Sequence, residues 1–200
     1  REAVLGSTHP DVATCLHLMG EIHRRQGDLA QAESLFQRAI TLREAALGEN
    51  GLLVAQSLNS LGAVYYVQGL YGQAEPLFQR ALAIREAALG NNHPDVAQTL
   101  NNLAIIYQEQ GLYGRAEPLL QRALAIQETV FGKNHRDVAD ALNNLGTLYW
   151  EQGSYSRVEP LLQRALAIWE AALGKSHPRV ALALHNLAVL YLEQGLYGRA

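Results

Sequence analysis

The chain has 200 residues, of which 48% are hydrophobic and 18% are charged, and its formal net charge is −3. This slightly acidic balance excludes the basic surface with which nucleic-acid-binding and peripheral membrane proteins hold anionic ligands. The single cysteine excludes an internal disulfide framework, and no apolar run approaches the ~20 residues that span a bilayer. We therefore expect a cytoplasmic protein that binds neither nucleic acid nor a membrane.

The two ends of the sequence copy internal segments. Residues 1–6, REAVLG, nearly repeat residues 43–48, REAALG, and we expect both to end a helix at a glycine cap. Residues 195–200, GLYGRA, repeat residues 111–116, where a second helix is expected to begin. We interpret residues 1–200 as one array of about five repeats, cut within a repeat at both ends.

A His-Pro-Asp-Val-Ala motif marks the expected start of most first helices. It stands at residues 9–13 and 93–97, with variants at 135–139 and 177–181. Proline suits the first helical position because its missing N–H would have no partner there, and an aspartate complements the helix dipole. We interpret the histidines of these motifs as helix caps.

Each motif is followed by two apolar stripes separated by a glycine. Leu100, Leu103 and Tyr107 are three and four residues apart, which places them on one helix face. Gly111 ends that helix, since glycine reaches positive φ without steric cost. We predict a first helix over 95–110 and a second helix over 114–131. Prolines fall near the first turn of the second helices, where a missing N–H costs little, at Pro76, Pro118 and Pro160.

The whole unit repeats every 42 residues. Residues 69–110 match residues 111–152 at 28 of 42 positions. Neither helix of a pair can bury its stripe alone, so successive pairs must stack to form a core. A small residue recurs on the second helices, which predicts a close helix contact at Ala39, Ala81, Ala123 and Ala165.

The residues at fixed intervals within a unit carry a family resemblance. They are Leu58, Leu61, Gly62, Tyr65, Ala74 and Phe78 in one unit and Leu100, Leu103, Ala104, Tyr107, Ala116 and Leu120 in the next. The pattern resembles the tetratricopeptide repeat. The 42-residue period is similar to that of kinesin light chains and of arrays attached to bacterial regulatory proteins. The resemblance implies an all-α solenoid of antiparallel helix pairs that winds into a superhelix.

The residues that could carry chemistry form no site. The motif histidines occur once per repeat, about 10 Å or more apart, which is too far to share a metal ion. Cys15 occupies a position that takes small residues in the other repeats, namely Ser57, Thr99, Ala141 and Ala183, which favours packing over nucleophilic catalysis. Neither a phosphate-binding loop nor a nucleophile elbow is present. We predict a protein that is not an enzyme and needs no cofactor or metal.

Glutamate and arginine recur on the second helices, as in Glu75 with Arg80 and Glu117 with Arg122. We interpret them as ion pairs on a solvated outer face, each contributing at most about 1 kcal/mol. The alternative is that this charged face binds a partner.

The first helices carry amides on the side opposite their buried stripe. Asparagine is a mediocre helix former, so its recurrence on one face indicates a purpose other than helix stability. If this face lines the superhelix, as the resemblance implies, the amides would hold the backbone of an extended peptide. The alternative is that the asparagines bond neighbouring helices and fix the repeat spacing. The candidate peptide-binding site comprises Asn59, Tyr66, Asn101, Asn102, Gln108, Asn143, Asn144, Trp150 and Asn186.

Within this set, the resemblance to kinesin light chains implies contacts to peptide backbone for Asn102, Asn144 and Asn186. Tyr66 and Trp150 are expected to be exposed aromatics that pack on the partner's side chains. The wall has few basic residues, so a preference for acidic peptides is not carried over from that family.

We therefore expect a protein-interaction module that binds an extended partner segment in the concave groove. Two alternatives remain: a self-associating structural spacer, and the sensor array of a larger NTPase or protease switch protein. The last first helix carries Leu184, Leu187 and Tyr191 and lacks the second helix that would cover them. This favours end-to-end self-association.

Overall fold

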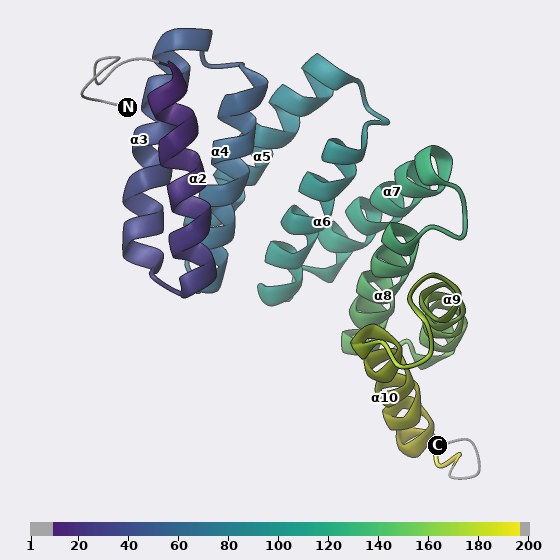
Figure 1. Ribbon diagram of the computed structural model, residues 1–200. Helices are drawn as coiled ribbons and strands as arrows, with labels where there is room; N and C mark the ends of the chain where they lie inside the picture. Colours follow the sequence, from purple (N-terminus) through teal and green to yellow (C-terminus); the bar gives the residue numbers. More distant parts are fainter. Residues whose placement is uncertain (1–9, 197–200) are drawn as a thin grey trace. The chain divides into compact units, whose positions relative to one another are not determined.

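The computed structural model describes residues 10–196, and every regular element in this range is an α-helix (Figure 1). The helices are α2 (Pro10–Gln26), α3 (Leu29–Leu47), α4 (Leu52–Val67), α5 (Tyr71–Leu89), α6 (Pro94–Glu109), α7 (Tyr113–Phe131), α8 (Arg136–Glu151), α9 (Tyr155–Leu173) and α10 (Pro178–Glu193). The predicted all-α architecture is confirmed. The expected cap at His9, the expected end of a helix within residues 1–6 and the expected start of a second helix within residues 197–200 lie outside the described residues.

The prolines of the second helices lie further along than predicted. Helix α7 starts at Tyr113, so Pro118 is its sixth residue and lies beyond the first turn. Pro118 therefore has no N–H to offer the carbonyl of Gly114, four residues earlier. Gly114 is exposed, so water can hydrate that carbonyl. Pro76 and Pro160 occupy the same position in α5 and α9, and the first-turn prediction is wrong for all three.

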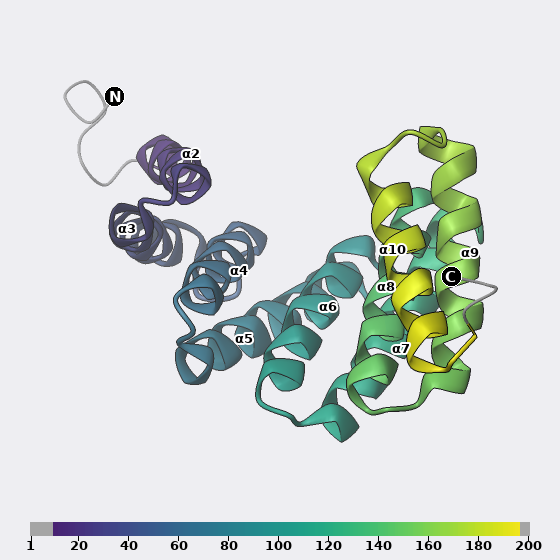
Figure 2. The ribbon, with the colours of Figure 1, turned by 90° about the horizontal axis from the view of Figure 1, so that it is seen from below.

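The chain divides into two compact units, Arg1–Gln110 and Gly111–Ala200. In the first unit, α2, α4 and α6 form one layer and α3 and α5 form the other, as Figure 2 shows. Helix α3 packs against α2 and α4, and α5 packs against α4 and α6. In the second unit, α8 packs against α7 and α9, and α9 also packs against α10. Within each unit, a second helix thus lies between two first helices, as stacked repeats require.

The predicted apolar stripes form the core. Leu100 is fully buried, and Leu103 and Tyr107 are each 4% exposed. The four recurring alanines are fully buried, which confirms the predicted close contact at Ala39, Ala81, Ala123 and Ala165. Gly62 marks an even closer approach, because a Cβ atom there would lie 2.9 Å from the ring of Phe78.

A recurring polar cluster joins second helices to the first helices that follow them. Glu75 Oε1 accepts hydrogen bonds from the Tyr107 hydroxyl at 3.0 Å and from Gln79 Nε2 at 2.9 Å, and Gln79 also donates to the Tyr107 hydroxyl at 3.2 Å. The same three residue types meet around Glu33, Glu117 and Glu159. These hydrogen bonds fix the register between successive repeats.

The prediction of ion pairs within one second helix needs correction. Arg80 bonds to Glu44 of the preceding second helix at 2.7 Å, and Arg164 bonds to Glu128 at 2.6 Å. Each arginine thus bridges two successive second helices. The charged ladder therefore runs from repeat to repeat.

Histidine caps begin three first helices, as predicted. The Nδ1 atoms of His93, His135 and His177 each accept a hydrogen bond from the backbone N–H two residues further on, at 3.1, 3.3 and 3.2 Å. These bonds satisfy N–H groups that have no partner inside the helix. None of the helices in the described part of the chain is long and apolar enough to cross a membrane.

Candidate functional site

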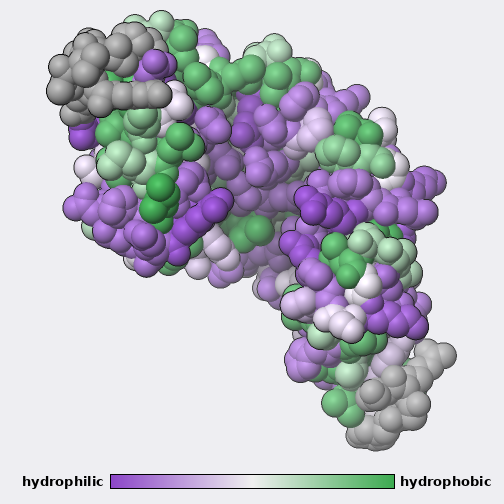
Figure 3. Space-filling view, viewed as in Figure 1, coloured by the Kyte–Doolittle hydropathy of each residue, from purple (hydrophilic) through white to green (hydrophobic). Residues whose placement is uncertain are grey.

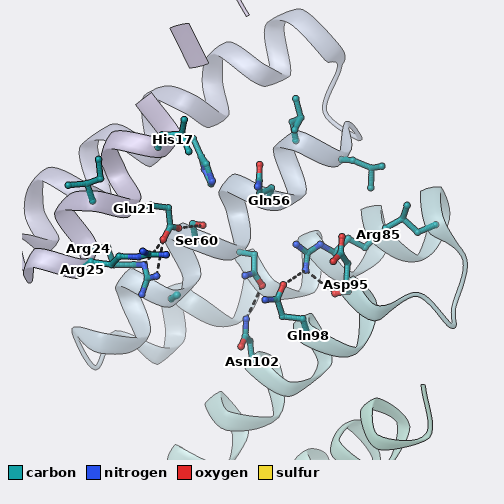
Figure 4. A pocket seen from close by; sticks show the side chains of 17 residues that line it. His17, Glu21, Arg24, Arg25, Gln56, Ser60, Arg85, Asp95, Gln98 and Asn102 are labelled. Carbon is teal, nitrogen blue, oxygen red and sulfur yellow. Dashed lines mark hydrogen bonds and ion pairs between the residues drawn. The ribbon is translucent and has the colours of Figure 1, made fainter. Parts of the chain in front are cut away.

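A groove of about 990 Å³ lies over the first helices of the N-terminal unit (Figure 4). Its lining includes Leu18 and Ile22 of α2, Leu52, Leu53, Gln56 and Asn59 of α4, Arg85 of α5, and Asp95, Gln98 and Asn102 of α6. Four of its aliphatic side chains, Leu18, Ile22, Leu52 and Leu53, are 42–56% exposed. Figure 3 shows hydrophobic side chains among hydrophilic ones over α2. The groove can therefore contact both apolar and polar groups of a ligand.

A buried arginine supports the α5–α6 side of this groove. Arg85 is 6% exposed, and its Nη1 atom donates to Thr99 Oγ1 at 2.6 Å, the carbonyl of Asp95 at 2.9 Å and Gln98 Oε1 at 3.3 Å. Figure 4 shows the side chain of Arg85 directed toward Gln98 and Asp95. Burial lowers the pKa of Arg85, but an arginine stays charged in proteins. Its charge is therefore held by several oxygen acceptors on the following first helix.

Arg43 repeats this arrangement one repeat earlier. It is 3% exposed and donates to Ser57 Oγ at 2.6 Å, and this oxygen also lies 3.3 Å from Nδ1 of His17. Burial of the imidazole, together with the positive charge of Arg43, lowers the pKa of His17 to about 4, although Glu21 opposes the shift. His17 is therefore neutral at physiological pH, and the three residues link α2, α3 and α4.

Glu21 connects α2 with α4 at the edge of the groove. Its Oε1 atom accepts from Ser60 Oγ at 2.6 Å, and its Oε2 atom accepts from Arg24 Nη2 at 2.8 Å. Burial of the carboxyl opposes ionisation, yet these hydrogen bonds lower the pKa of Glu21 below its ordinary value. Glu21 is thus an ionised, fixed acceptor, and the guanidinium of Arg25 beside it is exposed.

The structure separates the predicted site residues of the N-terminal unit. Asn59 and Asn102 both line the groove, and Asn102 Nδ2 donates to Asn59 Oδ1 at 3.0 Å. For this pair, the alternative role of joining neighbouring helices is therefore realised. Asn101, Tyr66 and Gln108 lie outside the groove lining, and Asn101 Oδ1 is buried without a hydrogen-bond partner in the described part of the chain.

Tyr66 is half-buried rather than freely exposed. Its ring lies 6.0 Å from that of Tyr71, and its hydroxyl donates to Glu109 at 3.4 Å. Tyr71 also donates to Glu109, at 3.1 Å. The aromatic pair and the carboxylate therefore connect the α4–α5 turn with the end of α6.

A smaller hollow of about 250 Å³ lies between α8, α9 and α10 in the C-terminal unit. It is lined by Gly146, Thr147, Trp150, Val158, Leu162, His185, Asn186 and Val189. Two predicted site residues, Trp150 and Asn186, meet here, whereas Asn143 and Asn144 of α8 lie outside its lining. Trp150 is half-buried and packs edge to face with Tyr155, at 5.8 Å between ring centroids.

Sequence reasoning missed the buried arginines, although the repeat alignment contains their signal. The position before Glu-Ala-Ala-Leu-Gly and its equivalents is occupied by Arg43, Arg85, Gln127 and Trp169. The small-residue position that follows each is occupied by Ser57, Thr99, Ala141 and Ala183. Arginine thus occurs with a hydroxyl, and glutamine or tryptophan occurs with alanine. This joint change indicates direct contact between the two positions.

The described residues offer no metal centre. Within residues 10–196, no three His, Cys, Asp or Glu side chains come together in a group that could hold an ion. Cys15 is half-buried at the small-residue position of α2. The groove and the hollow are the candidate sites, and their linings offer both apolar surface and hydrogen-bonding groups to a ligand.

A model of the tetratricopeptide repeat family matches residues 1–45, 53–129, 99–166 and 159–200. Among curated proteins, no significant match is found.

Solved structures of repeat proteins are similar over nearly the whole chain. BtubC (BKLC) from P. vanneervenii has a TM-score of 0.84 and 25% identity, with 96% of this chain and 76% of that chain covered. A P. anserina putative kinesin light chain with nearly identical TPR-like repeats has a TM-score of 0.79 and 24% identity, over 94% and 89% of the two chains. Apo RapI has a TM-score of 0.80 and 20% identity, over 93% and 65%. The last two show the fold alone.

Proposed function

This chain belongs to the tetratricopeptide repeat family and is a protein-interaction module; we propose that its first helices bind an extended segment of a partner protein. The observation that carries the proposal is the groove of about 990 Å³ in the N-terminal unit, to which three successive first helices contribute. A groove that crosses several parallel helices suits a ligand without secondary structure of its own, because each helix then contacts a different stretch of it.

The groove lining offers a bound peptide both apolar surface and hydrogen-bonding groups. Leu18 and Ile22 are 56% and 54% exposed on α2, and covering them would contribute about 25 cal/mol for each Å² of apolar surface. The bond between Asn59 and Asn102 uses one donor and one acceptor. An amide side chain has more than one polar group, so the pair keeps capacity for the backbone of a bound segment.

A charge placed on the aliphatic part of the groove tests this proposal. Ile22→Glu should lower the affinity for a partner protein, first isolated with the wild-type chain, by roughly tenfold or more, because the carboxylate must be desolvated on binding. The side chain is exposed, so the melting temperature should stay close to that of the wild type. Titration calorimetry with the purified partner measures the affinity.

Met19→Glu is the matched control. Met19 lies on the same helix, is 48% exposed and is not part of the groove lining. This variant carries the same added charge and should bind as the wild type does. If the two variants have equal affinity for the partner, the partner binds elsewhere, and the proposal that it binds in the groove is contradicted.

A second candidate function is self-association through α10, and its exposed leucines favour it. Leu182, Leu184 and Leu192 are 50%, 49% and 51% exposed. Leu187 and Tyr191, which the sequence suggested would also lie open, are only 5% and 9% exposed because α9 packs against α10. Sedimentation velocity over a range of concentrations tests this candidate. Leu184→Glu should shift any oligomer toward the monomer.

A further inference from the structure

The hollow in the C-terminal unit arises from one pairing of residues on neighbouring helices. Gly146 of α8 faces Leu162 of α9, and a Cβ atom on Gly146 would lie 3.3 Å from Leu162 Cδ2. In the first and second repeats the equivalent glycines face phenylalanines. A Cβ atom on Gly20 would lie 2.8 Å from the ring of Phe36.

The phenylalanine rings fill the space that the leucine leaves. Phe36 and Phe78 are 0% and 1% exposed and lie directly against the backbone of their glycines. Where the third repeat has a leucine, Leu120, its first helix carries Ala104 in place of glycine. The fourth repeat therefore combines the smallest residue on one helix with the shorter side chain on the other, and a hollow of about 250 Å³ results.

The lining of the hollow is mainly apolar. Val158 and Leu162 are buried in it, Trp150 and Val189 are half-buried, and no Asp, Glu, Lys or Arg belongs to its lining. A charged ligand group would lose its hydration without meeting an opposite charge, so the occupant must be neutral. Its volume is below the roughly 300–1,000 Å³ of sites for drug-sized ligands and suits a single side chain.

We propose that this hollow is a binding pocket for one apolar side chain, of leucine or phenylalanine size, presented by an extended protein segment. The inference rests on the proposed function and adds the kind of residue that the partner must carry. Asn186 and His185 of α10 also line the hollow, and their polar groups can bond the peptide groups on either side of the inserted side chain. Thr147 and Trp150 provide the α8 wall of the same pocket.

A small probe tests the pocket without knowledge of the partner. N-acetyl-leucine N-methylamide carries one apolar side chain between two peptide groups, and we expect it to bind with a dissociation constant on the order of millimolar. The chain has two tryptophans, and their indole N–H signals report on different places. Trp150 lines the hollow, whereas Trp169 is 2% exposed and donates to Asp140. In a two-dimensional NMR titration the Trp150 signal should shift and saturate, and the Trp169 signal should stay in place.

The alanine analogue of the probe should bind roughly tenfold or more weakly, because it buries far less apolar surface. An aspartate analogue should cause no saturable shift. If all three compounds shift the Trp150 signal equally, or if Trp169 follows Trp150, the pocket does not recognise an apolar side chain and the proposal is overturned.

Leu162→Phe is the decisive variant, because it restores the glycine–phenylalanine pairing of the earlier repeats and should fill the hollow. It should keep or raise the melting temperature and abolish the leucine probe's shift. Leu173→Phe makes the same substitution on the same helix outside the hollow and should leave probe binding unchanged. Unchanged binding by Leu162→Phe would overturn the proposal.

Gly146→Ala narrows the hollow by one methyl group and should weaken probe binding even if Leu162→Phe does not fold. The two proposals can fail separately. If the wild-type chain binds the probe as expected and Ile22→Glu still binds the partner normally, the pocket proposal stands and the groove proposal is contradicted.

Discussion

The N-terminal and C-terminal units place different kinds of side chain at the same buried position, where a second helix packs against the following first helix. In the first unit, Arg43 and Arg85 are buried and donate to hydroxyls on the next first helix, at 2.6 Å in both cases. In the second unit, Gln127 and Trp169 occupy the equivalent positions, and Trp169 is 2% exposed in an apolar cluster with Val138, Leu142, Ala165 and Val180. The hydroxyl positions there are Ala141 and Ala183.

The residue on the second helix thus changes together with its neighbour on the following first helix: arginine occurs with a hydroxyl, and glutamine or tryptophan occurs with alanine. A guanidinium needs oxygen acceptors inside the protein, and an indole needs an apolar neighbour of small size. Substitutions that mix the two solutions should therefore cost more than their individual sizes suggest.

The largest effect is expected when the N-terminal residue is placed in the C-terminal unit. Trp169→Arg removes a large buried ring together with its hydrogen bond to Asp140, and Ala183 offers the buried guanidinium no hydroxyl. We expect a loss of about 3–5 kcal/mol in the free energy of unfolding, measured by urea denaturation. Adding Ala183→Thr should recover part of this loss. If the single and double variants are equally stable, the two positions are not coupled.

Acid should lower the stability of the folded N-terminal unit through protonation of His17. Burial lowers its pKa from 6.5 to about 4, so the folded state favours the neutral imidazole. The unfolded chain then binds the extra proton first as the pH falls. The stabilisation by neutral His17 is complete above pH 6.5 and is lost as the pH falls toward 4, by at most about 3 kcal/mol.

His17→Asn is the matched variant for this effect, since asparagine occupies the same position in the next three repeats. Urea denaturation at pH 7 and pH 4.5 should show a smaller loss of stability for the variant than for the wild type. An identical loss in both proteins would mean that other groups cause the acid sensitivity.

Substitutions at two threonines test whether the Thr99 hydroxyl helps to hold the buried Arg85. Thr99 and Thr147 each donate to a backbone carbonyl four residues earlier, at 2.9 and 3.1 Å. Thr99 also accepts from a buried guanidinium, that of Arg85. Thr99→Val should therefore cost about 2 kcal/mol, whereas Thr147→Val, on an exposed residue, should change stability by less than about 0.5 kcal/mol. Equal effects would show that the hydroxyl contributes nothing to holding Arg85.

The smallest expected effect concerns the helix glycines. A Cβ atom on Gly62 would meet the buried ring of Phe78 at 2.9 Å, and we expect Gly62→Ala to destabilise by about 1 kcal/mol despite the better helix propensity of alanine. Gly146→Ala meets the more adaptable Leu162 at 3.3 Å and should be neutral or stabilising. Thermal melts of both variants make the comparison. Equal destabilisation would argue against free space beside Leu162.

The sequence predicts the architecture well because the repeat supplies the same evidence several times. Helix bounds, glycine ends, histidine caps and the buried alanines follow from local spacing and backbone geometry. The site is less accessible to such reasoning. Asn59 and Asn102 were predicted to share a face, yet their mutual hydrogen bond depends on how neighbouring repeats stack.

Contacts between repeats account for the other misses. Glu75 lies on a second helix, but Tyr107 of the following first helix donates to it. The hollow beside Trp150 depends on a pair of residues in different helices, so it cannot be predicted from any single position of the sequence. Comparing aligned pairs of positions, such as Arg85 with Thr99, would have exposed these contacts, whereas periodicity within one helix does not.

The central claim is that a partner binds the first-helix face, and photo-crosslinking tests it most directly. A photoreactive phenylalanine analogue placed at Ile22, Gln56, Gln98 or Thr147 samples the groove and the hollow; at Ala83, Ala125 or Ala167 it samples exposed positions on the second helices. With the purified partner, we expect crosslinks from the first set, mapped by mass spectrometry to one extended segment of the partner. Crosslinks mainly from the second set would contradict the claim and assign binding to the charged outer face.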